Sequence, residues 1–118
     1  MTAPEDDERP LDIATMRECA NRMLATDAPL PSWDELRTVT LKLRGHLMLL
    51  IPEVEDLVGR RPHGALPGTV ARAGVGEARR RLDELPGPTL PRAVSHAQRL
   101  ARSVEALCRH LERLAVPQ

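Results

Sequence analysis

Residues 36–57, LRTVTLKLRGHLMLLIPEVEDL, carry the apolar pattern that decides the fold. Its main row recurs at alternating steps of four and three residues, which places it on one face of an α-helix. That row consists of Leu36, Thr40, Leu43, Leu47, Leu50, Val54 and Leu57. A second row beside it, Leu41, Met48 and Leu49, widens the apolar surface beyond one narrow seam. A helix of this kind is predicted to be central to a core, or to contact a partner chain as well.

The start and the middle of this helix carry further signals. Ser32 and Glu35 have the spacing of a capping box, in which each side chain satisfies a free backbone amide of the first turn. Pro52 lies inside the apolar pattern, where it removes one backbone hydrogen bond and crowds the preceding turn. The sequence therefore predicts a helix over residues 33–58 that is kinked at Pro52, or broken near residues 49–51.

Three further segments have the same helical spacing of apolar residues, and they predict helices over residues 11–26, 69–85 and 92–115. Stretches rich in proline and glycine separate the four helices. Thr69 is the expected N-cap of the third helix, in which Gly74 and Gly76 are expected to let a neighbouring helix approach closely. Four amphipathic helices with short connections predict an all-α, antiparallel four-helix bundle with up-down-up-down topology.

The chain has 118 residues, the length of one domain, and we expect residues 11–116 to form that bundle. Residues 1–10 hold five charges and two prolines without periodicity, so they are predicted to be a flexible acidic arm. The predicted core consists of Ile13, Met16, Ala20, Met23, Leu36, Leu43, Leu47, Leu50, Val54, Val75, Ala78, Leu82, Ala97, Val104, Cys108 and Leu111.

Composition disfavours several classes of function. Trp33 is the only aromatic residue, which argues against strands and against the aromatic platforms that bind single-stranded nucleic acids. Seventeen basic and seventeen acidic residues balance, so no net charge steers the chain toward DNA or membranes. No apolar run approaches the roughly 18 residues of a membrane span, and the N-terminus lacks the pattern of a signal peptide. We therefore expect a cytoplasmic protein without a membrane partner.

Patterns that carry chemistry are missing from the sequence. No histidine follows a glutamate at the spacing of a di-iron or di-manganese site, and no Cys-x-x-Cys or His-Glu-x-x-His occurs. No nucleophile has an oriented base beside it, and no phosphate-binding loop occurs. We expect no metal and no cofactor, and the sequence leans against an enzyme without deciding the question. Cys19 and Cys108 are expected to be buried free thiols; the alternative is a redox pair where the two terminal helices meet.

Charge is distributed unevenly along the chain. Residues 1–59 carry six more acids than bases, and residues 60–118 carry six more bases than acids. One interpretation is that helices from the two halves neutralise each other, within one bundle or between two chains. The other is a basic face that binds an acidic partner, made of Arg79, Arg80, Arg99, Arg102, Arg109 and Arg113. Glutamates lie among these arginines and no helix-turn-helix pattern occurs, which disfavours binding to nucleic acid.

His46 follows Gly45 in the long helix, one position off the main apolar row. The simpler interpretation is a histidine at the edge of the core with one nitrogen in solvent. The functional alternative is a cleft at His46, in which Arg44 or Arg99 holds the anionic group of a small ligand.

Residues 43–57 (LRGHLMLLIPEVEDL), 75–83 (VGEARRRLD) and 96–114 (HAQRLARSVEALCRHLERL) carry a resemblance. Together they are similar to a small family of actinomycete proteins of unknown function that is loosely labelled with natural-product biosynthesis. The resemblance implies a small cytosolic accessory or regulatory protein and implies no reaction. We therefore predict a protein that acts by binding another protein, with a homodimer formed through Trp33 and Met48 as one such complex. The alternative is a ligand-binding or catalytic protein with a cleft at His46.

Overall fold

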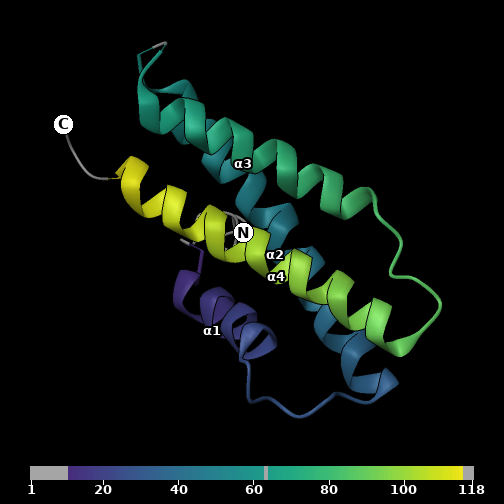
Figure 1. The fold of residues 1–118 in the computed structure, drawn as a ribbon. Coiled ribbons are helices and arrows are strands. Elements are labelled where there is room, and N and C mark those ends of the chain that lie inside the picture. Colours follow the sequence, from purple (N-terminus) through teal and green to yellow (C-terminus); the bar gives the residue numbers. More distant parts are fainter. Residues whose placement is uncertain (1–10, 63, 116–118) are drawn as a thin grey trace, which may run out of the picture.

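The computed structural model describes residues 11–62 and 64–115, and these residues form four α-helices. In chain order they are α1 (Ile13–Leu24), α2 (Trp33–Gly59), α3 (Leu66–Asp83) and α4 (Leu90–Ala115). Consecutive helices run in opposite directions (Figure 1), and no strand occurs in these two ranges. The predicted all-α, up-down-up-down four-helix bundle is confirmed. The expected acidic arm, residues 1–10, lies outside the described residues.

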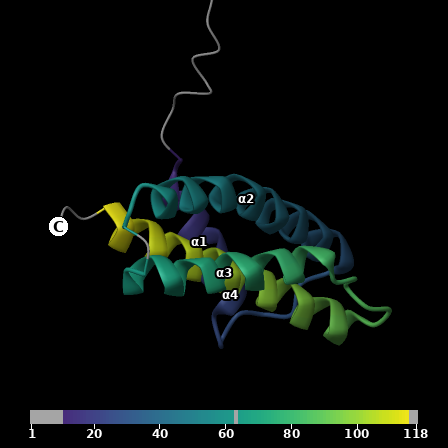
Figure 2. The same cartoon turned by 90° about the horizontal axis from the view of Figure 1, so that it is seen from above.

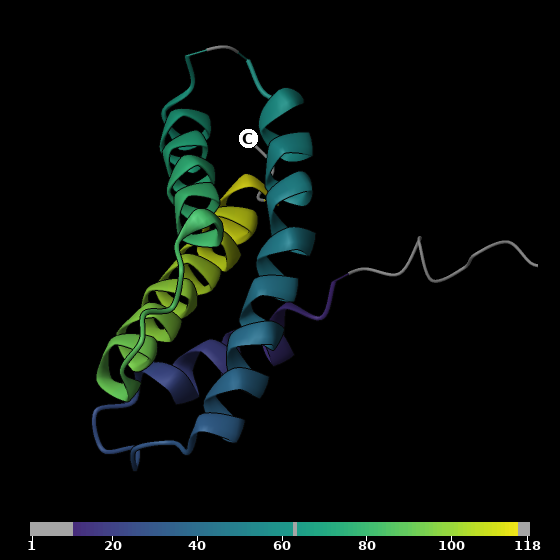
Figure 3. The ribbon, with the colours of Figure 1, turned by 90° about the vertical axis from the view of Figure 1, so that its right-hand side faces the viewer.

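Helix α4 is the one around which the other three assemble. It packs against α1, α2 and α3, while α1 and α3 lie on opposite sides of it without contact between their described residues (Figure 1). Helix α1 lies across the bundle rather than along it (Figure 3), so it contacts α2 only slightly. The long helix α2 also contacts all three others, as its wide apolar surface predicts, but the centre of the core is α4.

The core follows the predicted inner faces of the helices. Every predicted core residue is buried or partly buried; Ile13, Met23, Leu82 and Leu111 are the partly buried ones. The side chains of His96, Leu100 and Leu107 are also buried, although they lie outside the predicted set. These three lie beside the predicted core positions of α4, which are Ala97, Val104, Cys108 and Leu111. Because α4 is covered by three helices, it buries a wider surface than one stripe.

Helix α2 begins at the predicted capping box. The Glu35 amide donates to Ser32 Oγ at 3.2 Å, and the Ser32 amide donates to Glu35 Oε1 at 2.9 Å. The helix then continues through Pro52 without the predicted break, and it curves along its length (Figure 2). Leu50 and Val54, on either side of Pro52, are fully buried in the same core, while Pro52 itself is exposed. Packing on both sides therefore keeps the helix continuous where the proline removes one hydrogen bond.

The other helix boundaries differ from the predicted ones by a few residues. Helix α3 starts three residues before Thr69, because Pro67 is favoured in a first turn, where no amide partner is needed. Thr69 is therefore not the N-cap. Ala65 holds that position, and the Thr69 hydroxyl donates to the Ala65 carbonyl at 3.3 Å.

The two glycines inside α3 have different surroundings. A Cβ at Gly74 would lie 2.9 Å from His110 Nε2 of α4, so α3 and α4 approach closely there, as the sequence predicts. At Gly76 the nearest atom belongs to Arg80 of the same helix, at 4.0 Å. Close helix packing therefore explains Gly74 but not Gly76.

Gly76→Ala is expected to raise the free energy of unfolding by about 0.5–1 kcal/mol, because alanine has the higher helix propensity and its methyl group meets little. Gly74→Ala is the matched control: the same gain is offset by contact with His110, so the free energy of unfolding should stay level or fall. Urea denaturation followed by circular dichroism measures both values. A larger gain at Gly74 than at Gly76 would contradict the close approach of the two helices.

Candidate functional site

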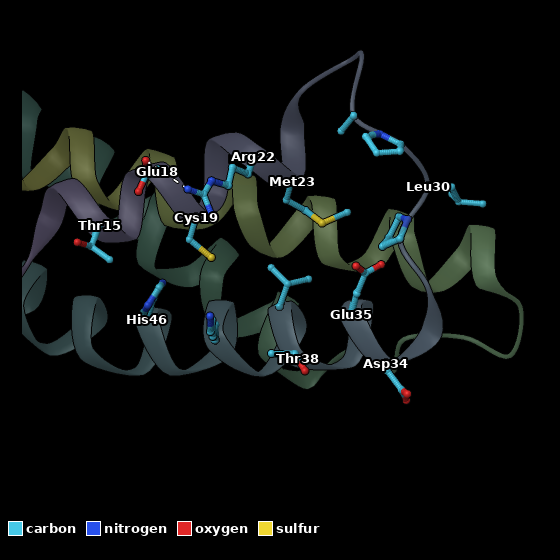
Figure 4. Close-up of a pocket in the computed structure, with 15 residues that line it drawn as sticks. Thr15, Glu18, Cys19, Arg22, Met23, Leu30, Asp34, Glu35, Thr38 and His46 are labelled. Carbon is cyan, nitrogen blue, oxygen red and sulfur yellow. Dashed lines mark ion pairs between the residues drawn. The ribbon is translucent and has the colours of Figure 1, made fainter.

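A long groove of about 1030 Å³ separates α1 from α2, which contact each other only slightly. His46 of α2 and Cys19 of α1 point into it from opposite sides (Figure 4). Arg22 lines the same groove and pairs with Glu18 at 3.5 Å, and the loop at residues 28–31 lines one end. The space is left open because α1 packs on α4 and crosses the bundle. The structure therefore has a cleft beside His46.

The surroundings of the groove favour the neutral forms of the His46 and Cys19 side chains. Burial, together with the charge of Lys42, holds the pKa of His46 below its ordinary value. Its Nδ1 is buried without a hydrogen-bond partner among the described residues. Burial raises the pKa of the Cys19 thiol, against the opposing charges of Lys42 and Arg22. A neutral imidazole and a protonated thiol can contact a ligand, but they are not the ion pair that makes a cysteine nucleophilic.

The second cysteine lies in the core. Cys108 of α4 is fully buried, and burial raises the pKa of its thiol to about 11. Both cysteines are free thiols. The expected buried free thiol is therefore found at Cys108, whereas Cys19 is only partly buried.

Arg44 and Arg99 lie away from His46. Arg44 and His46 are two positions apart on α2, so their side chains leave the helix in nearly opposite directions. The Arg44 guanidinium donates to the Leu82 carbonyl at 3.0 Å, which joins α2 to the end of α3. Arg99 of α4 donates to Glu84 Oε1 at 3.3 Å. The two arginines of the predicted ligand site are thus held near the C-terminal end of α3, apart from His46.

The histidine near these arginines is His96, in the second turn of α4. Only 1% of its surface is exposed, and its Nδ1 has no hydrogen-bond partner within the described ranges. Burial, with the charges of Arg99 and Arg44, lowers the pKa of His96, and the charge of Glu84 opposes this only in part. His96 is therefore neutral at pH 7. No sequence motif marks this residue, since its burial depends on parts of α2, α3 and α4 that meet only in the folded chain.

Glu84, which follows α3, ties that end of the helix to α4. It accepts from Arg81 at 2.8 Å and from Arg99 at 3.3 Å. The hydrogen bond from Arg81 is the main reason that the pKa of Glu84 lies below its ordinary value. Glu84 Oε1 also lies 3.9 Å from His96 Nδ1, beyond hydrogen-bond distance.

The predicted basic face is largely neutralised by carboxylates of the same chain. The pairs are Arg79 with Glu55 at 2.8 Å, Arg80 with Glu77, Arg99 with Glu84 at 3.3 Å, and Arg109 with Glu105 at 3.7 Å. Arg102 and Arg113 make no ion pair in the part of the chain that the structure describes. Neutralisation within one bundle therefore accounts for most of this face, and Arg102 and Arg113 are its exceptions among the described residues.

These features define a small helical protein with a groove between α1 and α2. No group of three His, Cys, Asp or Glu side chains placed to hold a metal ion occurs among the described residues, and none of their helices is long and apolar enough to span a membrane. A family model matches residues 14–116, and the chain belongs to that family, a family of unknown function (DUF6415). The match covers all four helices, including α1, which contributes nothing to the resemblance seen in the sequence. No curated protein and no solved structure matches the chain.

Acidification should destabilise the protein through His96. The folded protein keeps this histidine neutral, with a pKa below its ordinary value of 6.5, whereas the unfolded chain takes up a proton near that pH. The stabilising contribution is therefore complete above about pH 6.5 and is lost as the pH falls below it. The limiting slope is about 1.4 kcal/mol per pH unit. Urea denaturation between about pH 7.5 and pH 5.5 measures this slope.

His96→Gln removes the titrating group and should flatten the pH dependence of the free energy of unfolding. His46→Gln is the comparison: its imidazole is only partly buried, so the flattening should be smaller. A His96→Gln variant that keeps the full wild-type slope would show that His96 does not titrate differently in the folded and unfolded states.

Proposed function

We propose that this protein acts by binding other protein surfaces, through the outer face of α2. We use this name for Leu41, Met48 and Leu49, which are 65%, 57% and 51% exposed, together with Gly45 between them. Clusters of large exposed apolar side chains mark sites of protein interaction. Trp33, at the start of the same helix and 45% exposed, adds a residue type that anchors interfaces. These exposed side chains are the observation that carries the proposal.

The occupant that suits this face best is a second copy of the chain. Leu41 and Leu49 lie four residues before and four residues after Gly45, and nothing lies within 4 Å of the position where a Cβ would stand on Gly45. Two antiparallel copies of α2 that cross at Gly45 would bring their backbones close together. Leu41 of each copy would then meet Leu49 of the other, so that the interface makes every contact twice.

The basic face is a second candidate surface, for an acidic protein partner. Arg102 and Arg113 lack acidic partners among the described residues, which supports this assignment. Each exposed ion pair is worth only about 0–1 kcal/mol, so the surrounding arginines would have to exchange their own carboxylates for those of the partner. Such binding would weaken as salt shortens the Debye length below about 10 Å.

The setting that we propose is an accessory or regulatory role in the cytoplasm, in natural-product metabolism. It is supported by the resemblance of residues 43–57, 75–83 and 96–114 to actinomycete proteins with that label. A second candidate function is the binding of a small ligand in the α1–α2 groove, which the unpaired Nδ1 of His46 supports. Mass spectrometry of the protein isolated from its native cells under non-denaturing conditions would detect such a ligand.

Met48→Glu is expected to weaken self-association at least about tenfold, because a symmetric interface would bury two added charges. Sedimentation equilibrium from low to high micromolar concentration should give twice the chain mass of 13.1 kDa for the wild type and the chain mass for the variant. Leu66→Glu is the matched control, since Leu66 is 71% exposed on α3, away from this face, and should leave the dimer intact.

Two results would overturn the assignment of the outer face of α2. One is a monomer at every concentration for the wild type. The other is a dimer that resists Met48→Glu but dissociates when both Arg102 and Arg109 are changed to Glu, which would place the interface on the basic face.

A further inference from the structure

A second groove, of about 390 Å³, lies between the first half of α2, the end of α3 and the start of α4. Its volume is in the range of about 300–1,000 Å³ that small-molecule sites occupy. Most of its lining is apolar and consists of Trp33, Leu36, Leu41, Leu82, Leu85 and Pro86. Polar side chains line it as well, and in a mostly apolar site such groups orient a small ligand; they are Arg37, Thr40, Arg44, Asp83, Glu84 and His96.

Arg44 is the cation of this groove that has no acidic partner. It is partly buried, and its guanidinium donates to the Leu82 carbonyl at 3.0 Å. It makes no ion pair with any carboxylate in the described ranges. Partly buried charges are normally paired, and a guanidinium has five N–H donors, so Arg44 retains donors for a further acceptor. The other arginine that lines the groove, Arg37, already pairs with Asp34 at 3.2 Å.

The polar groups around Arg44 favour an acceptor with a single negative charge. Glu84 is engaged by Arg81 and Arg99, so it does not neutralise Arg44. His96 lies close enough to Arg44 for the arginine charge to lower the pKa of the imidazole, and both residues line the groove. Asp83, which is exposed, also lines it and would repel a second negative charge.

We propose that this groove binds a small monocarboxylic acid with an apolar body. The carboxylate accepts hydrogen bonds from Arg44, in the paired geometry that a guanidinium offers to two oxygens. The apolar body lies along Trp33, Leu82 and Leu85 and is removed from water there. The site shares Leu41 of the outer face of α2 and the interface anchor Trp33 with the proposed interface, and is otherwise separate from it.

Trp33 makes the site directly measurable, because it is the only aromatic residue of the chain and lines the groove. Titration with octanoate at about pH 7.5 should change the Trp33 fluorescence with a saturable dependence. Arg44→Met keeps the apolar stem and removes the charge, and it should weaken octanoate binding at least about tenfold. Arg44→Lys should restore part of the affinity, and 1-octanol, which lacks the charge, should bind wild type and Arg44→Met alike.

Lys42→Met is the matched control. Lys42 lies two positions from Arg44 on α2 but lines the α1–α2 groove, so its loss should leave octanoate binding unchanged. Leu85, which is 85% exposed, gives a second pair of variants that cannot disturb the core. Both Leu85→Glu and Leu85→Lys remove an apolar contact, but only glutamate repels the carboxylate, so octanoate should bind more weakly to Leu85→Glu than to Leu85→Lys.

The proposal fails if octanoate gives no saturable change in the wild type, or if Arg44→Met and Leu85→Glu both bind as the wild type does. Loss of binding in Lys42→Met but not in Arg44→Met would move the ligand to the α1–α2 groove. Met48→Glu separates this site from the proposed interface: the variant should bind octanoate with wild-type affinity even where it no longer self-associates.

Discussion

The rest of the structure depends on the burial of α4 by three other helices. Leu100, Val104 and Leu107 of α4 have no exposed surface, and neither do the small side chains of Ala97 and Ala101. Burial of apolar surface is the dominant favourable term in folding. Because the chain has one aromatic residue, aliphatic side chains supply this buried surface. The alanines of α4 let neighbouring helices approach closely, and Gly74 of α3 allows the same close approach from the α3 side of that contact. Since α1 and α3 do not contact each other within the described residues and α1 contacts α2 only slightly, α4 is the main connection between them.

Both grooves follow from this arrangement. Helix α1 is held on α4 by Arg17, whose Nε donates to Glu105 Oε1 at 2.9 Å and whose guanidinium also pairs with Glu112. A helix fixed there and inclined to the bundle cannot also fill the space along α2, and the α1–α2 groove results (Figures 3 and 4). Helix α3 ends at Asp83, and the groove that Arg44 lines lies between this end, the first half of α2 and the start of α4. The grooves are therefore gaps between elements that α4 positions, not additions to the fold.

The sequence predicts the helices and most of the core because apolar spacing is a local property that survives in the folded chain. It predicts less where two local signals compete. Thr69 is a good cap, yet the preference of Pro67 for a first turn moves the start of α3. Pro52 is a helix breaker, yet buried neighbours on both sides keep α2 continuous. The surroundings of His96 could not be predicted, because the charges that act on its pKa, those of Arg99, Glu84 and Arg44, are brought together from three helices or their ends.

The arginines show why composition is a poor guide to function in this chain. Sixteen of its seventeen basic residues are arginine, and a surface row of them suggests an anion-binding face. Most arginines of that row form ion pairs with glutamates one turn away or on a neighbouring helix. Each such pair contributes little to stability, and the paired charges leave little net field. Arg44 belongs to no row, but it is partly buried, lacks a carboxylate partner in the described ranges and borders an apolar groove. One unpaired, partly buried cation beside an apolar groove would recognise an anion more selectively than many solvated ones, because the same charge interacts more strongly where the dielectric constant is lower.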